Sequence, residues 1–199
     1  MLKKLALIVV ALLVILVIVI MLQPGQLTIS RSATIPAPQE VTYALVNDFH
    51  SWDRWSPWAK RDPNMKVEHS GAPSGKGAIY YWKGNSDVGE GRMNIDDSRP
   101  YDHIRIFLEF IKPIGGQSYT DFDFTPQGDQ TRVTWKMEMK QSFLAKAMGL
   151  LMDMDAMIGQ DFENGLAQLA TAAQAVNAER TPPPPPAAEA PAEAPGAKP

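Results

Sequence analysis

The longest apolar run lies at the N-terminus, where residues 5–22 are all Leu, Ile, Val, Ala or Met. A transmembrane helix needs about 20 such residues, whereas the core of a signal peptide usually has about 7–15. No Ala-x-Ala-like cleavage site follows in Gln23–Gln26. The run therefore predicts a retained signal anchor, with a cleaved signal peptide as the alternative. Because Lys3 and Lys4 precede the run, we expect the N-terminus in the cytoplasm and the rest of the chain outside it, in the periplasm if the cell is Gram-negative.

Seven segments beyond the anchor have the alternating or β-rich composition of strands. The first, Gln26–Ile35, is followed by a short predicted helix at Gln39–Val46. In the last three strands one face is apolar and the other polar, which is typical of an antiparallel meander with one wet side. Gly89 and Gly91 indicate a bulge or a close backbone approach. The six later strands are predicted at Met65–His69, Gly77–Lys83, Val88–Asp96, His103–Ile111, Gln117–Thr125 and Gln130–Lys140.

Apolar positions recur at helical spacing from Ser142 to Val176. A break near Met152 is expected, with Asp153 as the N-cap of the longer second part. This long helix must cover the apolar face of a curved sheet, since no other element can do so. The pattern divides the chain into an anchor (1–24), a folded domain (25–178) and a tail rich in Pro and Ala (179–199), which we expect to be disordered.

The segment Asn47–Trp58 contains Trp52, Trp55 and Trp58, three of the five tryptophans. Tryptophan buries a large apolar area and still needs a partner for its indole N–H. The segment therefore closes one end of a core or lines the mouth of a pocket. We interpret it as a lid, in which Trp52 packs as core and Trp55 forms the cavity wall.

The predicted order of elements resembles that of the SRPBCC superfamily: one strand, a short helical pair, six strands and a long helix. This superfamily has the START-like helix-grip fold of polyketide cyclase/dehydrase and lipid transport-like proteins. The similarity covers about residues 26–178. It is carried by Arg31–Pro38 running into a helix, Asn47-Asp48-Phe49 with Trp52, Trp55, Pro57 and Trp58, Gly89–Met93, Thr131–Trp135 and Asp161–Leu169. The resemblance implies an α+β fold, in which a curved antiparallel sheet of about seven strands wraps a long C-terminal helix around a deep apolar cavity. Members of the superfamily include lipid and steroid carriers, cyclases and hydroxynitrile-type enzymes.

Charge and composition narrow the function classes. With 19 basic and 22 acidic residues the net charge is −3, which argues against a nucleic-acid partner. The sequence has no cysteine, and His50, His69 and His103 lack the spacing of metal ligands, so we expect no metal and no cofactor. His50 lies close to Asp48, Asp53, Ser51 and Ser56. A hydrolytic dyad could be drawn from them, but Asp and Ser beside helix ends are usually caps.

The leading hypothesis is a membrane-anchored, extracytoplasmic module that binds a hydrophobic small molecule or lipid between the sheet and the C-terminal helix. Numerous methionines on the inner faces slightly favour an adaptable apolar site, although ordinary filling of a core explains them as well. No catalytic residue is assigned, and the ligand and the oligomeric state stay open. The predicted lining residues are Trp55, Tyr80, Trp82, Leu108, Phe122, Trp135, Met137, Met154, Ile158 and Phe162.

Two alternatives remain. A cyclase/dehydrase-type enzyme would need at least two convergent polar groups in the cavity, from Tyr80, Glu90, Arg92 and His103. Glu90 and Arg92 share a strand face, so they could form a buried pair that binds a polar head group, or an exposed pair at the edge. The third possibility is a non-catalytic envelope interaction domain, with the proline-rich tail as spacer or partner ligand.

Overall fold

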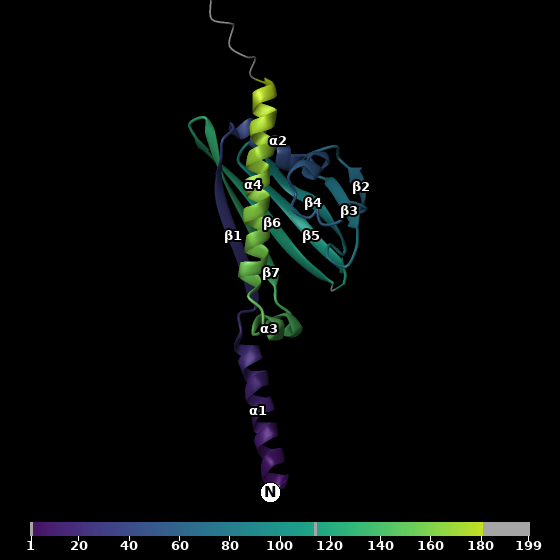
Figure 1. Cartoon of the computed structure of the whole chain (residues 1–199), viewed down its shortest axis with the longest axis vertical. Helices are drawn as coiled ribbons and strands as arrows, with labels where there is room; N and C mark the ends of the chain where they lie inside the picture. The colour runs from purple at the N-terminus through teal and green to yellow at the C-terminus, as the bar shows by residue number, and fades with distance from the viewer. Residues whose placement is uncertain (1, 114, 181–199) are drawn as a thin grey trace, which may run out of the picture.

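The computed structural model describes residues 2–113 and 115–180, so the tail predicted at 179–199 lies almost wholly outside the described residues. An N-terminal helix projects from a domain in which a curved sheet faces one long helix (Figure 1). The elements are α1 (Leu2–Leu22), β1 (Gln26–Ile35), α2 (Gln39–Asn47), the 3-10 helix η1 (Phe49–Arg54), β2 (Lys66–Gly71), β3 (Ala78–Lys83), β4 (Glu90–Arg99), β5 (His103–Lys112), β6 (Gly116–Gln127), β7 (Gln130–Lys140), α3 (Phe143–Gly149) and α4 (Met154–Arg180).

The seven strands form one antiparallel sheet in the order β1-β7-β6-β5-β4-β3-β2. The predicted fold class is therefore confirmed. The first strand pairs with the last along its whole length, from Gln26 opposite Lys140 to Ile35 opposite Thr131. Strand β4 starts at Glu90 because Gly89, at φ +67°, turns the chain before it. A register shift between Glu90 and Gly91 confirms the predicted bulge.

The predicted break in the C-terminal helix is confirmed. Helix α3 ends at Gly149, and α4 starts at Met154 after a short connection. The Asp153 carboxylate accepts a hydrogen bond from the backbone N–H of Ala156 at 2.9 Å, so it is the N-cap that the sequence predicts. Ser142 caps α3 in the same way, accepting from the N–H of Ala145 at 3.2 Å.

Helix α4 lies across the concave face of the sheet and contacts β1, α2 and η1 (Figure 1). It lies close to the sheet because Gly165 faces the ring of Trp135. A Cβ atom at position 165 would come within 2.7 Å of that ring, which is closer than real contacts allow. Because glycine has no side chain, position 165 lets α4 approach the sheet closely, while the apolar stripe of the helix packs against it.

Candidate functional site

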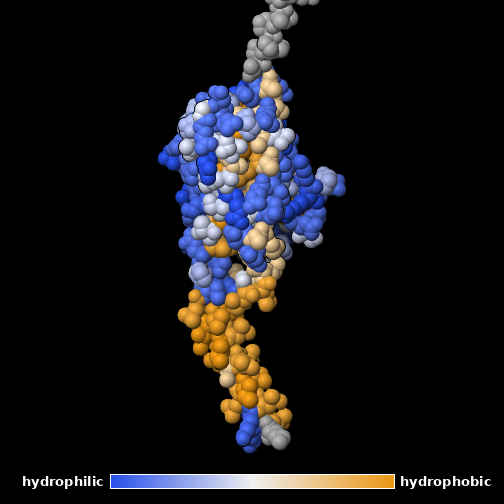
Figure 2. Space-filling model, turned by 60° about the vertical axis from the view of Figure 1, so that its left-hand side comes forward, coloured by the Kyte–Doolittle hydropathy of each residue, from blue (hydrophilic) through white to orange (hydrophobic). Residues whose placement is uncertain are grey.

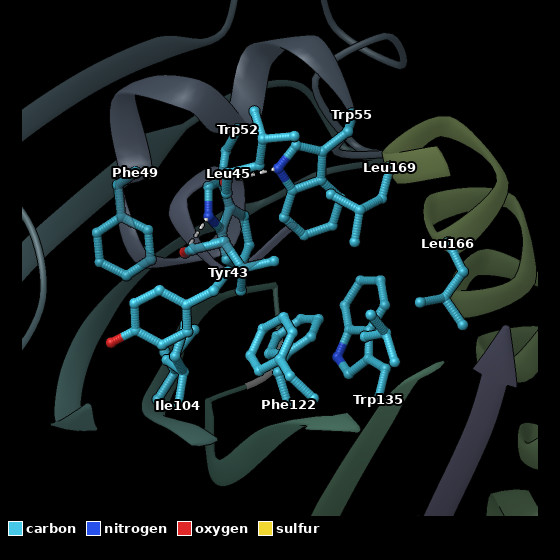
Figure 3. Packing of buried hydrophobic residues seen from close by; sticks show 14 of the residues in the cluster. Tyr43, Leu45, Phe49, Trp52, Trp55, Ile104, Phe122, Trp135, Leu166 and Leu169 are labelled. Atoms are coloured by element: carbon cyan, nitrogen blue, oxygen red, sulfur yellow. Dashed lines mark hydrogen bonds between the residues drawn. The ribbon is translucent and has the colours of Figure 1, made fainter. Parts of the chain in front are cut away.

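The tryptophan-rich segment is held by hydrogen bonds to the end of α2. The Trp52 indole N–H donates to the carbonyl of Val46 at 2.9 Å, and that of Trp55 donates to the carbonyl of Leu45 at 3.0 Å. Both indoles are buried (Figure 3). Because their polar atoms are satisfied by the backbone, the rings can close the end of the core without a buried unpaired donor.

His50 lies in the same segment, with 56% of its side chain exposed, and its ring stacks on that of His69 with centroids 4.0 Å apart. Asp48 accepts from the backbone N–H of His50 at 2.9 Å and lies 2.8 Å from its ring Nδ1. Asp48 therefore acts as the cap of η1. This geometry supports the structural interpretation of His50 over a hydrolytic dyad.

Aromatic rings fill the centre of the space between sheet and helix. Trp135 stacks on Phe162 of α4 with ring centroids 4.2 Å apart and an interplanar angle of 5°. Phe122 lies 4.8 Å and Trp55 5.8 Å from the Trp135 ring (Figure 3). All four side chains are buried. In the centre of the domain, the side chains of the sheet and of α4 are therefore in direct contact.

The other predicted lining residues surround this aromatic centre. Trp82, Leu108 and Met137 are buried on the concave face, and Tyr80 is half-buried beside them. Met154 and Ile158, in the first turns of α4, are half-buried as well. That these ten side chains contact a ligand stays a prediction.

An open pocket of about 510 Å³ lies at the end of the domain nearest α1, which we call the basal pocket. The segment between α1 and β1 forms one side, and the connection from β7 through α3 to α4 forms the other. Met154 is the one predicted lining residue that borders it. The lining residues are Gln23, Pro24, Gln26, Leu27, Gln141, Lys146, Gly149, Leu150, Leu151, Met152, Asp153, Met154 and Asp155. The signal that could have found them is the apolar run Leu150–Met152 at the helix break.

Arg31 of β1 reaches α4 beside this pocket. Its Nε donates to Glu163 at 2.8 Å and its Nη2 to Asp155 at 3.0 Å. These hydrogen bonds, the one to Asp155 first, raise the pKa of the guanidinium. The guanidinium passes directly over Gly159, where a Cβ atom would lie 2.0 Å from Nη2. The ion pairs therefore tie the start of α4 to the edge strand and fix one wall of the basal pocket.

The residues considered for catalysis do not converge. Glu90 and Arg92 lie on the convex face and pair with other residues, so the predicted pair between them does not form. Glu90 accepts from the Tyr81 hydroxyl at 2.7 Å and lies 3.1 Å from the Lys112 ammonium, and these hydrogen bonds lower its pKa. The Arg92 guanidinium donates to Glu109 at 2.6 Å.

His103 also lies on the convex face, where its Nδ1 is 2.7 Å from the Asp123 carboxylate. Tyr80 faces the concave side, and burial, followed by the charge of Asp53, raises the pKa of its phenol to about 12. Among residues 2–113 and 115–180, no cluster of three His, Cys, Asp or Glu side chains could hold a metal ion.

The sequence profile of the polyketide cyclase / dehydrase and lipid transport family matches residues 26–174, from the start of β1 into α4. The chain belongs to this family. The match leaves out α1. A comparison with curated protein sequences returned no match.

Solved structures share the fold at low sequence identity. CV1439 from Chromobacterium violaceum is 14% identical with a TM-score of 0.54, over 74% of this chain and 96% of that one. TTHA0849 from Thermus thermophilus is 18% identical with a TM-score of 0.54, over 75% of this chain and 99% of that one. Mll3558 from Rhizobium loti is 20% identical with a TM-score of 0.53, over 74% and 96%. These similarities concern the fold of the family domain.

Proposed function

We propose that the protein is a membrane-anchored, extracytoplasmic module that binds a hydrophobic small molecule or lipid, with the basal pocket as its binding site. The observation that carries the proposal is the position of this pocket, at the end of the domain from which the apolar helix α1 projects. Membership of a family that includes lipid transport supports the same class of ligand.

The anchor is supported by the length and surface of α1. Its apolar run, residues 5–22, gives about 27 Å of helix, close to the roughly 30 Å hydrocarbon core of a bilayer. Apart from Ile20, its described apolar side chains are exposed, so the helix buries almost none of its surface against the domain. A signal peptide would share the composition of α1, and the proposal is that the helix is retained.

The chemistry of the basal pocket suits a molecule with an apolar body and a polar end. Leu27, Leu150 and Met154 supply apolar surface, while Lys146 and Asp153 supply charge. Its volume lies within the roughly 300–1,000 Å³ typical of small-molecule sites. Methionine has an unbranched, polarizable side chain that adapts to irregular apolar shapes, so the pocket can adjust to its ligand.

Native mass spectrometry of the full chain, extracted from its own membrane, tests the proposal. We expect a co-purified hydrophobic molecule in the wild type and its loss in Met154→Trp, which fills the pocket. Met157→Trp is the matched control, because Met157 is 52% exposed and lies outside the pocket lining. A wild-type protein with no bound molecule, or equal occupancy in the two variants, would contradict the proposed site.

A further inference from the structure

A surface of exposed apolar side chains lies beside the basal pocket, on α3 and the connection to α4. We call it the basal patch. Leu151 is 89% exposed, Leu144 59% and Phe143 54%, and Met148 and Met152 are exposed next to them. Five large apolar side chains clustered within ten residues are unusual on a surface that faces water, where such patches commonly mark an interaction site.

The basal patch continues the apolar surface of α1. Helices α1 and α3 are in contact, and Figure 2 shows hydrophobic surface running from α1 onto the base of the domain. In α3 the apolar Phe143, Leu144 and Met148 are exposed, whereas Lys146 is half-buried and lines the basal pocket. Exposed apolar side chains next to a membrane-spanning helix are suited to the boundary between lipid tails and head groups.

We propose that the basal patch inserts into the leaflet of the bilayer that α1 spans, and that the basal pocket therefore opens to the membrane. The ligand class is then a molecule that resides in the bilayer, a lipid or another amphiphile, which enters sideways from that leaflet. Leu151 and Met152 belong both to the patch and to the pocket lining, so inserting the patch places the rim of the pocket among lipids. This inference rests on the proposed function for the anchor and for the pocket.

The short connection between α1 and β1 keeps the basal patch close to the bilayer. Residues 23–25 separate the end of α1 from the start of β1, and three extended residues span at most about 11 Å. The base of the domain thus stays within that distance of the point where α1 leaves the hydrocarbon core. A protein partner or a second copy of the chain would have to fit into this gap.

Depth-dependent fluorescence quenching tests the insertion. The chain has no cysteine, so single cysteines can carry an environment-sensitive dye at chosen positions of the full chain. In phosphatidylcholine vesicles we expect a dye at Leu144→Cys to be quenched by lipids brominated on their acyl chains. A dye at Asp129→Cys, an exposed position in the β6–β7 turn at the opposite end of the domain, should instead be quenched by aqueous iodide. Iodide quenching of both dyes would overturn the proposal.

Transfer of a fluorescent phospholipid from vesicles to the protein tests the route by which the ligand reaches the basal pocket. The double variant Phe143→Asp/Leu144→Asp removes apolar contact outside the pocket lining, and acidic residues suit the first turn of a helix. We expect uptake from vesicles to slow by roughly tenfold relative to wild type, while Gln127→Asp/Gln130→Asp, at exposed positions of the opposite end of the domain, leaves it unchanged. Equal uptake by the two double variants would overturn the membrane route.

A third measurement separates this inference from the proposed function. The same phospholipid is presented in detergent micelles, where no bilayer needs to be penetrated. We expect the Phe143→Asp/Leu144→Asp variant to bind as wild type does under these conditions. Loss of binding by the double variant in micelles would overturn the attribution of slower uptake to membrane access, because the variant then damages the pocket itself. Failure of the wild type to bind in micelles would remove the proposed function, whatever the dye at position 144 reports.

Discussion

Replacing Trp135 by alanine tests whether the centre of the domain is packed rather than hollow. The ring is 2% exposed, stacks on Phe162 and donates its indole N–H to the Thr120 hydroxyl at 2.8 Å. Tryptophan buries up to about 250 Å², which at about 25 cal/mol per Å² gives an upper estimate of about 6 kcal/mol. Measured Trp→Ala losses in cores are about 3–5 kcal/mol, a total that already includes the loss of a hydrogen bond worth about 1 kcal/mol.

We therefore expect Trp135→Ala to lower the free energy of unfolding by about 4 kcal/mol, a large share of the roughly 5–15 kcal/mol typical of a domain. Guanidinium unfolding of the full chain in micelles, followed by circular dichroism, measures the loss. Trp58→Ala is the control, because Trp58 is half-buried against the same ring, and its loss should be roughly half as large. If Trp135→Ala costs less than about 1 kcal/mol, the centre is loosely packed and the argument for a filled core fails.

Two further predictions concern single side chains. The pKa of Tyr80 is raised to about 12 in the folded protein, against about 10 in the unfolded chain. The contribution of its neutral phenol to the free energy of unfolding is therefore fully present below about pH 10. Up to about 3 kcal/mol of this contribution is lost as the pH rises towards 12. Tyr80→Phe should flatten the fall in Tm above about pH 10, and a slope equal to that of wild type would refute this assignment. Asp153→Ala should lower the free energy of unfolding by about 1 kcal/mol in urea, and Asp153→Ser should restore most of it because serine also caps helices. Equal losses in both variants would show that the cap is not what stabilises α4.

The order and type of the elements could be predicted because each strand and helix has its own periodicity. The alternation in Gln130–Lys140 and the cap at Asp153 are local signals, and both are confirmed in the structure. The hypothesis that Glu90 pairs with Arg92 is wrong, and the reason is physical. Residues two apart on one strand lie farther from each other than from their partners on the neighbouring strand, and the register supplies Lys112 and Glu109 as those partners.

The basal pocket was not predicted, because helical periodicity does not say what an apolar face meets. Leu150 and Leu151 follow the same spacing as Leu166 and Leu169, yet the first pair is exposed and the second buried. The difference arises at the break before Asp153, which separates α3 from the helix that covers the sheet. Several predicted lining residues, such as Trp55, Phe122 and Trp135, are buried on the inner side of the domain. That Trp135 of the sheet meets Phe162 of α4 depends on the tertiary structure, which the periodicity of either element does not give.

The pairing of β1 with β7 sets an order on folding. Strands β2 to β7 pair with their sequence neighbours, so each contact closes a short loop and costs little chain entropy. The ladder between Gln26 and Lys140 instead requires that β7 has been made. During synthesis the first strand therefore stays without its partner until β7 emerges. Its pairing with β7 and the packing of α4, which follows β7 in the chain, are then the late, non-local steps that complete the fold.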